Sequence, residues 1–266
     1  MTVQARDILD HFSLTPPDTP TLAFVGELLA AYVRRVPWGS VCRIARRAAN
    51  DTPAKRARFV DAFWTDVLAG AGDGTCFESN YAFFALLLDL GYEGYLTIND
   101  MGETIGCHSA IVLQIDGEKW LVDVGLPVFA LLHLTLDDTT RADSPWHIYH
   151  AIPADDGVTY AIMRSHHPKP VAFTLKDVPV SDADYRARLV RDHEADGLFL
   201  DKVILNMVVD DVYWRYNGRG NPRQMESFPS RANKQTHLID GDIAEALAAR
   251  FGMDEERLRA ALDAEA

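Results

Sequence analysis

The stretch 73-DGTCFESNYAFFALLLDLGY-92 places a cysteine between a glycine-rich turn and a long apolar run. The apolar run predicts a helix from about Cys76 to Leu90, which Gly91 ends. A cysteine at the first position of a helix meets free backbone N–H groups and the positive end of the helix dipole, and both stabilise a thiolate. A small structural cysteine would lie more naturally inside the apolar run. The position of Cys76 therefore favours a nucleophile.

A nucleophilic thiol needs a base, and the base needs an orienting partner. His108 stands at the start of the strand-like run CHSAIVLQI, and Asp123 lies in the next run, WLVDVGL. The Asp116-Gly117 pair between the two runs predicts a hairpin that brings both side chains onto one face. We expect Asp123 to bind Nδ1 of His108, which leaves Nε2 to take the proton from Cys76.

Each of these residues also has a plain structural explanation. A buried filler cysteine, a satisfied core histidine and a strand-edge aspartate are, taken singly, the more common cases. An aspartate between Val122 and Val124 is nevertheless costly to bury unless it is paired. The three residues together favour a catalytic arrangement.

The flanking sequence predicts an α+β protein in three sections. Residues 1–92 are expected to form a helical bundle, residues 93–180 an antiparallel β-barrel, and residues 181–266 a mixed section of helices and strands. The predicted helices are 21–36, 53–69, 76–90, 183–191 and a pair on either side of Phe251-Gly252. The predicted strands are 94–100, 107–116, 119–126, 158–165, 170–175, 202–209 and 211–218. No repeat or low-complexity linker separates the sections, so we expect one body.

Composition argues against several classes of protein. The 266 residues carry a net charge of −13, and a nucleic-acid-binding protein would need a basic face for phosphate contact. No run of about 18 apolar residues indicates a membrane span, and the N-terminal segment lacks a signal-peptide pattern. Three cysteines do not describe a disulfide framework, so a reducing cytoplasm is expected. No C-x-x-C or H-E-x-x-H spacing occurs, and we expect no metal site.

Basic residues concentrate between Arg34 and Arg58. Eight of them are opposed by Asp51 alone: Arg34, Arg35, Arg43, Arg46, Arg47, Lys55, Arg56 and Arg58. Two interpretations stay open. The cluster is either a solvated helical face or a local site for phosphates or for an acidic partner such as a carrier domain.

The pattern around Cys76 and Asp123 resembles the arylamine N-acetyltransferase family. The order Cys, His, Asp, the CFE-x-N sequence at the cysteine and the V-D-V-G sequence at the aspartate carry the resemblance. It covers nearly the whole chain, including the Val36-Pro37-Trp38 step and the segment from Leu247 to Asp254. The resemblance implies a helical bundle, a β-barrel and a C-terminal α/β lid, with a cysteine-protease-like core at their junction.

The resemblance also implies roles for individual residues. Cys76 is the acyl-accepting nucleophile, His108 is the base and Asp123 orients the base. Glu78 and Asn80, early in the helix, brace the nucleophile turn.

The chain departs from the family at positions that border the acyl donor and acceptor. The family usually has R-G-G-x-C and V-D-V-G-F-G, whereas this chain has Gly72-Asp73-Gly74-Thr75 before the cysteine and ends the second motif with Gly125-Leu126-Pro127. Pro127 cannot donate a backbone hydrogen bond. The P-F-E-N-L segment becomes Pro37-Trp38-Gly39-Ser40-Val41. The expected substrate-binding residues are Trp38, Thr75, Gly125 and Leu126, with core packing as the alternative for Trp38.

The sequence thus predicts a cytoplasmic, cysteine-dependent acyltransferase. It would move an acyl group from a thioester, through an acyl-cysteine, to a small-molecule amine, while backbone N–H groups at the helix start hold the oxyanion. The candidate donors are acetyl-CoA, another acyl-CoA and an acyl carrier protein thioester, with no tightly bound cofactor and no nucleic-acid or membrane partner. Amide formation in natural-product biosynthesis is one such reaction. The alternatives are a hydrolase or transglutaminase-like enzyme with the same triad, and a catalytically silent binding protein of this fold.

Overall fold

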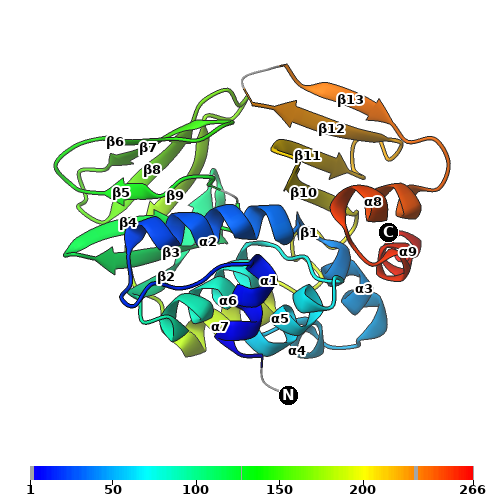
Figure 1. The fold of residues 1–266 in the computed structure, drawn as a ribbon, viewed down its shortest axis with the longest axis horizontal. Helices are drawn as coiled ribbons and strands as arrows, with labels where there is room; N and C mark the ends of the chain where they lie inside the picture. The colour runs from blue at the N-terminus through cyan, green and yellow to red at the C-terminus, as the bar shows by residue number, and fades with distance from the viewer. Residues whose placement is uncertain (1–2, 127, 231–232, 266) are drawn as a thin grey trace.

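The computed structural model describes residues 3–126, 128–230 and 233–265. Helices dominate its first part: α1 (Ala5–Phe12), α2 (Leu22–Arg35), α3 (Val41–Ala49), α4 (Pro53–Arg56), α5 (Val60–Leu68) and α6 (Cys76–Asp89). In Figure 1 most of them lie below two sheets, with α2 across the middle. The Thr21 hydroxyl caps α2 by accepting a hydrogen bond from the Phe24 amide at 3.2 Å. The helices predicted at 21–36 and 76–90 are confirmed.

The single helix predicted over 53–69 is wrong. α4 and α5 are separate, and residues 57–59 form a break between them. The backbone N–H of Arg58 donates to the Glu78 carboxylate at 3.1 Å, and both side chains are buried. A buried ion pair thus overrides the helical propensity of the segment.

The middle of the chain forms an antiparallel sheet with the strand order β5-β4-β3-β2-β9-β8-β7-β6. Its strands are β2 (Glu93–Met101), β3 (Thr104–Ile115), β4 (Glu118–Val122), β5 (Leu132–Leu134), β6 (Thr140–Asp143), β7 (Ile148–Pro153), β8 (Thr159–Arg164) and β9 (Val171–Lys176). β5 lies beside β6 and β7, so the sheet curls into a nearly closed barrel, as predicted.

The β3–β4 hairpin decides where the functional side chains fall. Ile115 pairs with Glu118, so Asp116 and Gly117 form a two-residue loop. Their φ values of 53° and 80° are those of a type I′ turn, which confirms the hairpin predicted from the sequence.

In its described residues, the last part of the chain adds a second sheet and three helices. Its elements are α7 (Asp182–Arg191), β10 (Ile204–Val209), β11 (Val212–Asn217), β12 (Gln224–Pro229), β13 (Gln235–Leu238), α8 (Ile243–Phe251) and α9 (Glu255–Asp263). The sheet order is β1-β10-β11-β12-β13, and β1 (Trp38–Gly39) comes from the helical part of the chain. The predicted helices on either side of Gly252 are confirmed.

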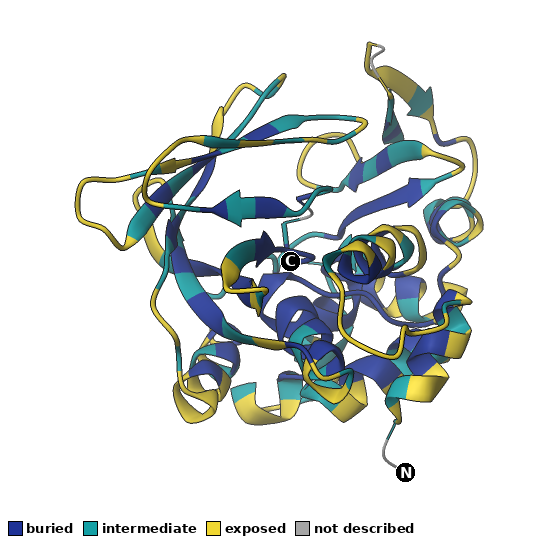
Figure 2. Ribbon diagram, turned by 60° about the vertical axis from the view of Figure 1, so that its left-hand side comes forward, coloured by how far each residue is buried: buried dark blue, intermediate teal, exposed yellow. Residues whose placement is uncertain are grey.

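The three sections share their interiors. β1 joins the C-terminal sheet, and Tyr185 of α7 is fully buried in a cluster that also holds residues of α2, α6 and β3. Buried residues gather where the helices meet the sheets, whereas exposed residues cover the outer helices and loops (Figure 2). The division at 1–92, 93–180 and 181–266 therefore stays a prediction. Within the described ranges, no helix combines the length and apolar character that a membrane crossing requires.

Candidate active site

Cys76 occupies the first position of α6, behind a tightly packed turn. A Cβ added to Gly74 would lie 2.6 Å from Cε2 of Phe63 and 2.8 Å from Oγ of Ser79, so only glycine fits there. The Gly74 carbonyl accepts a hydrogen bond from the Gly39 amide at 3.1 Å. The cysteine that the sequence analysis singled out is thus held by packing on both sides of the turn.

His108 and Asp123 meet as the hairpin predicted. Nε2 of His108, on β3, lies 2.8 Å from Oδ2 of Asp123, which directly follows β4. Both side chains are buried, and the Phe173 ring packs against the imidazole with ring centroids 4.5 Å apart. The predicted use of the two ring nitrogens is wrong. Since Nε2 binds Asp123, Nδ1 is the nitrogen left for Cys76.

The Asp123 carboxylate is fixed by more than the imidazole. Its Oδ1 accepts hydrogen bonds from Nδ2 of Asn80 at 3.0 Å and from the amides of Gly125 at 2.8 Å and Leu126 at 3.1 Å. Oδ1 of Asn80 in turn accepts from the Val124 amide at 3.1 Å. Asn80 therefore ties the second turn of α6 to the loop after β4.

The electrostatics of His108 favour its charged form. Burial alone would lower the pKa of His108, but the charge of Asp123, its hydrogen bond and the interaction with the Cys76 side chain raise it to about 10. The imidazole consequently keeps its proton at neutral pH. An imidazolium beside a cysteine sulfur favours the thiolate, the form that acts as a nucleophile.

A second set of contacts ties the first turn of α6 to β3 and α7. The Ser109 hydroxyl donates to the Cys76 carbonyl at 3.0 Å, and the Tyr185 hydroxyl contacts Ser109 Oγ at 2.8 Å and the Phe77 carbonyl at 3.0 Å. Sγ of Cys76 lies 3.7 Å from the Cys107 carbonyl. Sequence reasoning missed Ser109 and Tyr185, because nothing in the sequence places α7 beside β3.

The residues expected to bind substrate border Cys76 in different ways. A Cβ on Gly125 would lie 2.4 Å from Cα of Cys76, and the indole N–H of Trp38 donates to the Gly125 carbonyl. The Thr75 hydroxyl accepts a hydrogen bond from Nη1 of Arg43 at 3.2 Å, and the amide of Leu126 is used by Asp123. Their contact with substrate stays a prediction. Pro127 lies outside the described residues.

A pocket of about 330 Å³ lies beside the site. Its lining is Thr104, Ile105, Cys107, Arg188, Arg191, Asp192, Asp196, Gly197 and Leu198. Cys107 links it to Cys76, since its carbonyl faces the sulfur. The two arginines come from α7, far along the chain, and the sequence carried no signal for them. A second cavity, of about 10 Å³ and thus the size of about one water, borders Trp38 and Val124.

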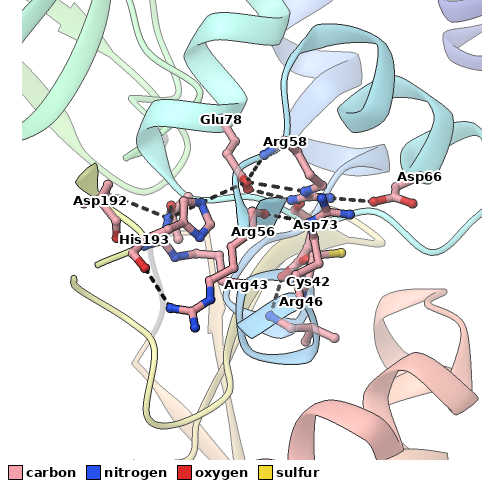
Figure 3. A network of polar contacts seen from close by, with 12 residues as sticks. Cys42, Arg43, Arg46, Arg56, Arg58, Asp66, Asp73, Glu78, Asp192 and His193 are labelled. Atoms are coloured by element: carbon pink, nitrogen blue, oxygen red, sulfur yellow. Dashed lines mark hydrogen bonds and ion pairs between the residues drawn. The ribbon is translucent and has the colours of Figure 1, made fainter. Parts of the chain in front are cut away.

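The basic cluster between Arg34 and Arg58 fits neither of its two interpretations at its centre. Arg43 and Arg58 are only 1% exposed, and Arg43 pairs with Asp192 at 2.9 Å (Figure 3). The guanidinium groups of Arg46, Arg47 and Arg56 donate to backbone carbonyls. These five arginines therefore bind groups of the chain itself, whereas Arg34, Arg35 and Lys55 are exposed. Among the described residues, no group of three or more His, Cys, Asp or Glu side chains is placed to hold a metal ion.

Gly125→Ala should destabilise the protein by about 1–3 kcal/mol and slow acyl transfer, because the new methyl group would push Cys76 and Asn80 away. Urea unfolding and the transfer rate measure the two effects. Gly26→Ala, inside α2 with 3.8 Å to the nearest side-chain atom, is the matched control and should be neutral or slightly stabilising. Equal behaviour of the two variants would show that the close approach of Gly125 is unimportant.

Asp123→Asn should lower the pKa of His108 from about 10 towards its ordinary value of 6.5, since the main cause of the raised pKa is removed. The His108 ring of the variant would then lose its proton as the pH rises through 7. The wild-type ring stays protonated at that pH. An NMR titration of the His108 ring measures the change. An unaltered titration would contradict the assigned pair.

Comparisons with known proteins identify the family and the fold. A family model described as N-acetyltransferase matches residues 61–258, more than half of the chain. The arylamine N-acetyltransferase from Mycobacterium abscessus covers 98% of this chain and 94% of its own, with a TM-score of 0.80 and 18% identity. The Mycobacterium marinum arylamine N-acetyltransferase in complex with CoA covers 98% of each chain, with a TM-score of 0.79 and 17% identity.

A curated relative matches over a shorter stretch. Proansamycin X synthase from Amycolatopsis mediterranei (strain S699) is 32% identical over 119 residues, which are 42% of this chain and 43% of that protein. The match thus spans less than half the length of either chain. The fold of the two solved structures confirms the predicted helical bundle, barrel and lid with a cysteine-protease-like core. With the family model matching most of its length, the chain belongs to the arylamine N-acetyltransferase family of N-acyltransferases.

Proposed function

We propose that the chain transfers an acyl group from a thioester to a small-molecule amine through an acyl-cysteine on Cys76. One observation carries the proposal: His108 interacts with the Cys76 side chain on one side and with the buried Asp123 carboxylate on the other. This arrangement supplies a nucleophile, a proton carrier and an orienting group at the start of one helix.

In the first step the Cys76 thiolate attacks the carbonyl carbon of the thioester. A new C–S bond forms, and the bond to the donor sulfur breaks. Imidazolium His108 gives its proton to the leaving thiolate, so the donor departs as a free thiol. Thr75, the residue that precedes α6, makes no side-chain cap hydrogen bond, which leaves the first amides of the helix available to the oxyanion.

In the second step the amine attacks the acyl-cysteine carbonyl. Neutral His108 takes the proton of the amine, the amide product forms, and the C–S bond to Cys76 breaks. The thiolate and the imidazolium are thereby restored. Asp123 keeps the ring in place throughout, because its other oxygen is held by Asn80 and by two backbone amides.

An acyl-CoA is the donor that we propose, with acetyl-CoA the first to test. The Mycobacterium marinum relative was solved in complex with CoA. The pocket of about 330 Å³ reaches the site at Cys107, and Arg191 in its wall suits a donor that carries phosphates. Arg188, also in the wall, donates to the Gly106 carbonyl at 2.9 Å. The basic cluster between Arg34 and Arg58 does not favour a carrier-protein donor, because the arginines at its centre donate to carbonyl groups of the chain itself.

Amide formation during the assembly of a natural product is the second candidate. The curated relative named proansamycin X synthase supports it, since that protein is 32% identical over the matched segment. The two candidates share the acyl-cysteine step and differ in the size of the acyl group and of the amine.

Cys76→Ser should abolish acyl uptake, because a hydroxyl is a far poorer nucleophile than a thiolate. Intact-mass analysis after incubation with a panel of acyl-CoA thioesters and acyl carrier proteins measures the uptake. The wild type should gain one acyl mass and lose it when an amine is added. Cys42→Ser, at a buried cysteine of α3 whose sulfur contacts the Ala71 carbonyl, should still gain the mass. Acyl transfer by the Cys76 variant at the wild-type rate would overturn the proposal.

Arg191→Ala should raise the KM for acyl-CoA by roughly three- to tenfold with little change in kcat, because this arginine would contact the non-reacting part of the donor. Steady-state kinetics at low ionic strength measure the effect, which added salt should weaken. Arg6→Ala, an exposed arginine on α1, is the matched control. An unchanged KM for the Arg191 variant would move the donor out of this pocket.

A further inference from the structure

Arg58 is a buried charge that the proposed reaction does not use. It lies in the break between α4 and α5, and its side chain is 0% exposed. Burying a guanidinium is costly unless good partners replace the lost water. The identity of those partners therefore indicates what the residue is for.

The partners of Arg58 stand before and after Cys76 in the sequence, and Figure 3 shows Asp66, Asp73 and Glu78 around its guanidinium. Its Nη2 contacts Oε2 of Glu78 at 2.7 Å and also donates to the carbonyl of Asp73. Its Nη1 lies 3.1 Å from Oδ2 of Asp66. Arg58 thus joins the residue three positions before the sulfur to the residue two positions after it.

The turn before Cys76 is held at its other end by α3. The carboxylate of Asp73 accepts hydrogen bonds from the amides of Val41 at 2.8 Å and Cys42 at 2.9 Å. Asp73 thus caps α3 with its side chain and binds Arg58 with its backbone carbonyl. This double attachment fixes the backbone that leads into the nucleophile.

Two acidic groups flank the start of α6. Burial would raise the pKa of Glu78, but Arg58 and then His193 outweigh it and hold that pKa well below its usual range, so the carboxyl is ionised. Burial raises the pKa of Asp73, and the charge of Arg58 opposes this. Negative charge at these positions would disfavour a thiolate on the same helix end, unless a cation offsets it.

Further titratable groups lie around Arg58 and its partners. Nε2 of His193 lies 3.3 Å from Oε1 of Glu78, and Arg257 shares Asp66 with Arg58 at 3.3 Å. Burial lowers the pKa of His193, so the ring adds no positive charge at neutral pH. The Cys42 thiol stays protonated, since burial raises its pKa to about 12.

We propose that Arg58 is the positioning residue of the nucleophile turn: its guanidinium holds the Asp73 carbonyl, three residues before Cys76, and balances the charge of the buried Glu78 carboxylate, two residues after it. The inference rests on the proposed role of Cys76. It also accounts for a departure from the family pattern. The arginine of R-G-G-x-C is replaced by Gly72, where a Cβ would lie 2.5 Å from the Val67 amide nitrogen, so a guanidinium can arrive only from elsewhere.

The test compares Arg58→Lys and Arg58→Met with the double variant Arg58→Met/Glu78→Gln. Each protein is checked for its fold by circular dichroism and then alkylated with iodoacetamide, with the rate at Cys76 followed by mass from pH 5 to pH 10. The methionine variant should react roughly tenfold more slowly at pH 6, and its kcat should fall with little change in the KM for acyl-CoA. The lysine variant should keep part of the rate, and the double variant should regain most of it because both charges are removed.

Arg46→Met is the matched control, since this arginine belongs to the same cluster but donates to the backbone carbonyls of Arg56 and Lys55. It should react with iodoacetamide at pH 6 at the wild-type rate, even where its stability drops. A purely structural role for Arg58 would lower stability in all its variants and leave the alkylation profile of the folded protein unchanged, which would overturn the inference. If Arg58→Met does not fold, a double variant that reacts no faster than Arg58→Lys would also overturn the inference.

The two proposals fail separately. If Cys76→Ser still takes up acyl groups, the acyl-cysteine mechanism falls. If Cys76→Ser is inactive while folded Arg58 variants react like the wild type, only the proposal for Arg58 is overturned.

Discussion

The close contact between the start of α6 and the loop after β4 is the constraint on which the site depends. No side chain separates Gly125 from Cys76, since a Cβ there would lie 2.4 Å from Cα of the cysteine. That contact sets how far the loop reaches, and with it the position of Asp123, two residues earlier. His108 follows, because its Nε2 binds the carboxylate and its ring then faces the sulfur. The positions of the catalytic side chains thus depend on the packing of the backbone at Gly125 and Cys76.

Buried charged groups form ion pairs on both sides of Cys76. Asp123 pairs with His108 on the barrel side, while Arg58 pairs with Glu78 on the helical side. Water cannot solvate these groups, so each charge is stable only next to its partner. Removing one member leaves the other uncompensated, which is why such groups affect reactivity as well as stability.

Membership of the family and departure from its sequence pattern are compatible at the level of structure. The chain superposes on arylamine N-acetyltransferases over almost its full length at 17–18% identity. In this chain Gly72 stands where the family pattern has an arginine, and Arg58 contacts the turn before Cys76 through the Asp73 carbonyl. Function in such a case is best judged from which groups surround the nucleophile rather than from which positions supply them.

Local sequence determined much of this protein. The apolar run behind Cys76, the Asp116-Gly117 turn and the Cys, His, Asp order were enough to predict α6, the β3–β4 hairpin and the meeting of His108 with Asp123. These features follow from short-range backbone preferences and from strand pairing over two residues of loop. Tertiary structure alone decided the rest: the break at Arg58, the burial of Arg43, the arginines of α7 beside Cys107, and the ring nitrogen that faces Cys76. Each depends on contacts between residues far apart in the chain, and such contacts override local propensity where a buried charge must find its partner.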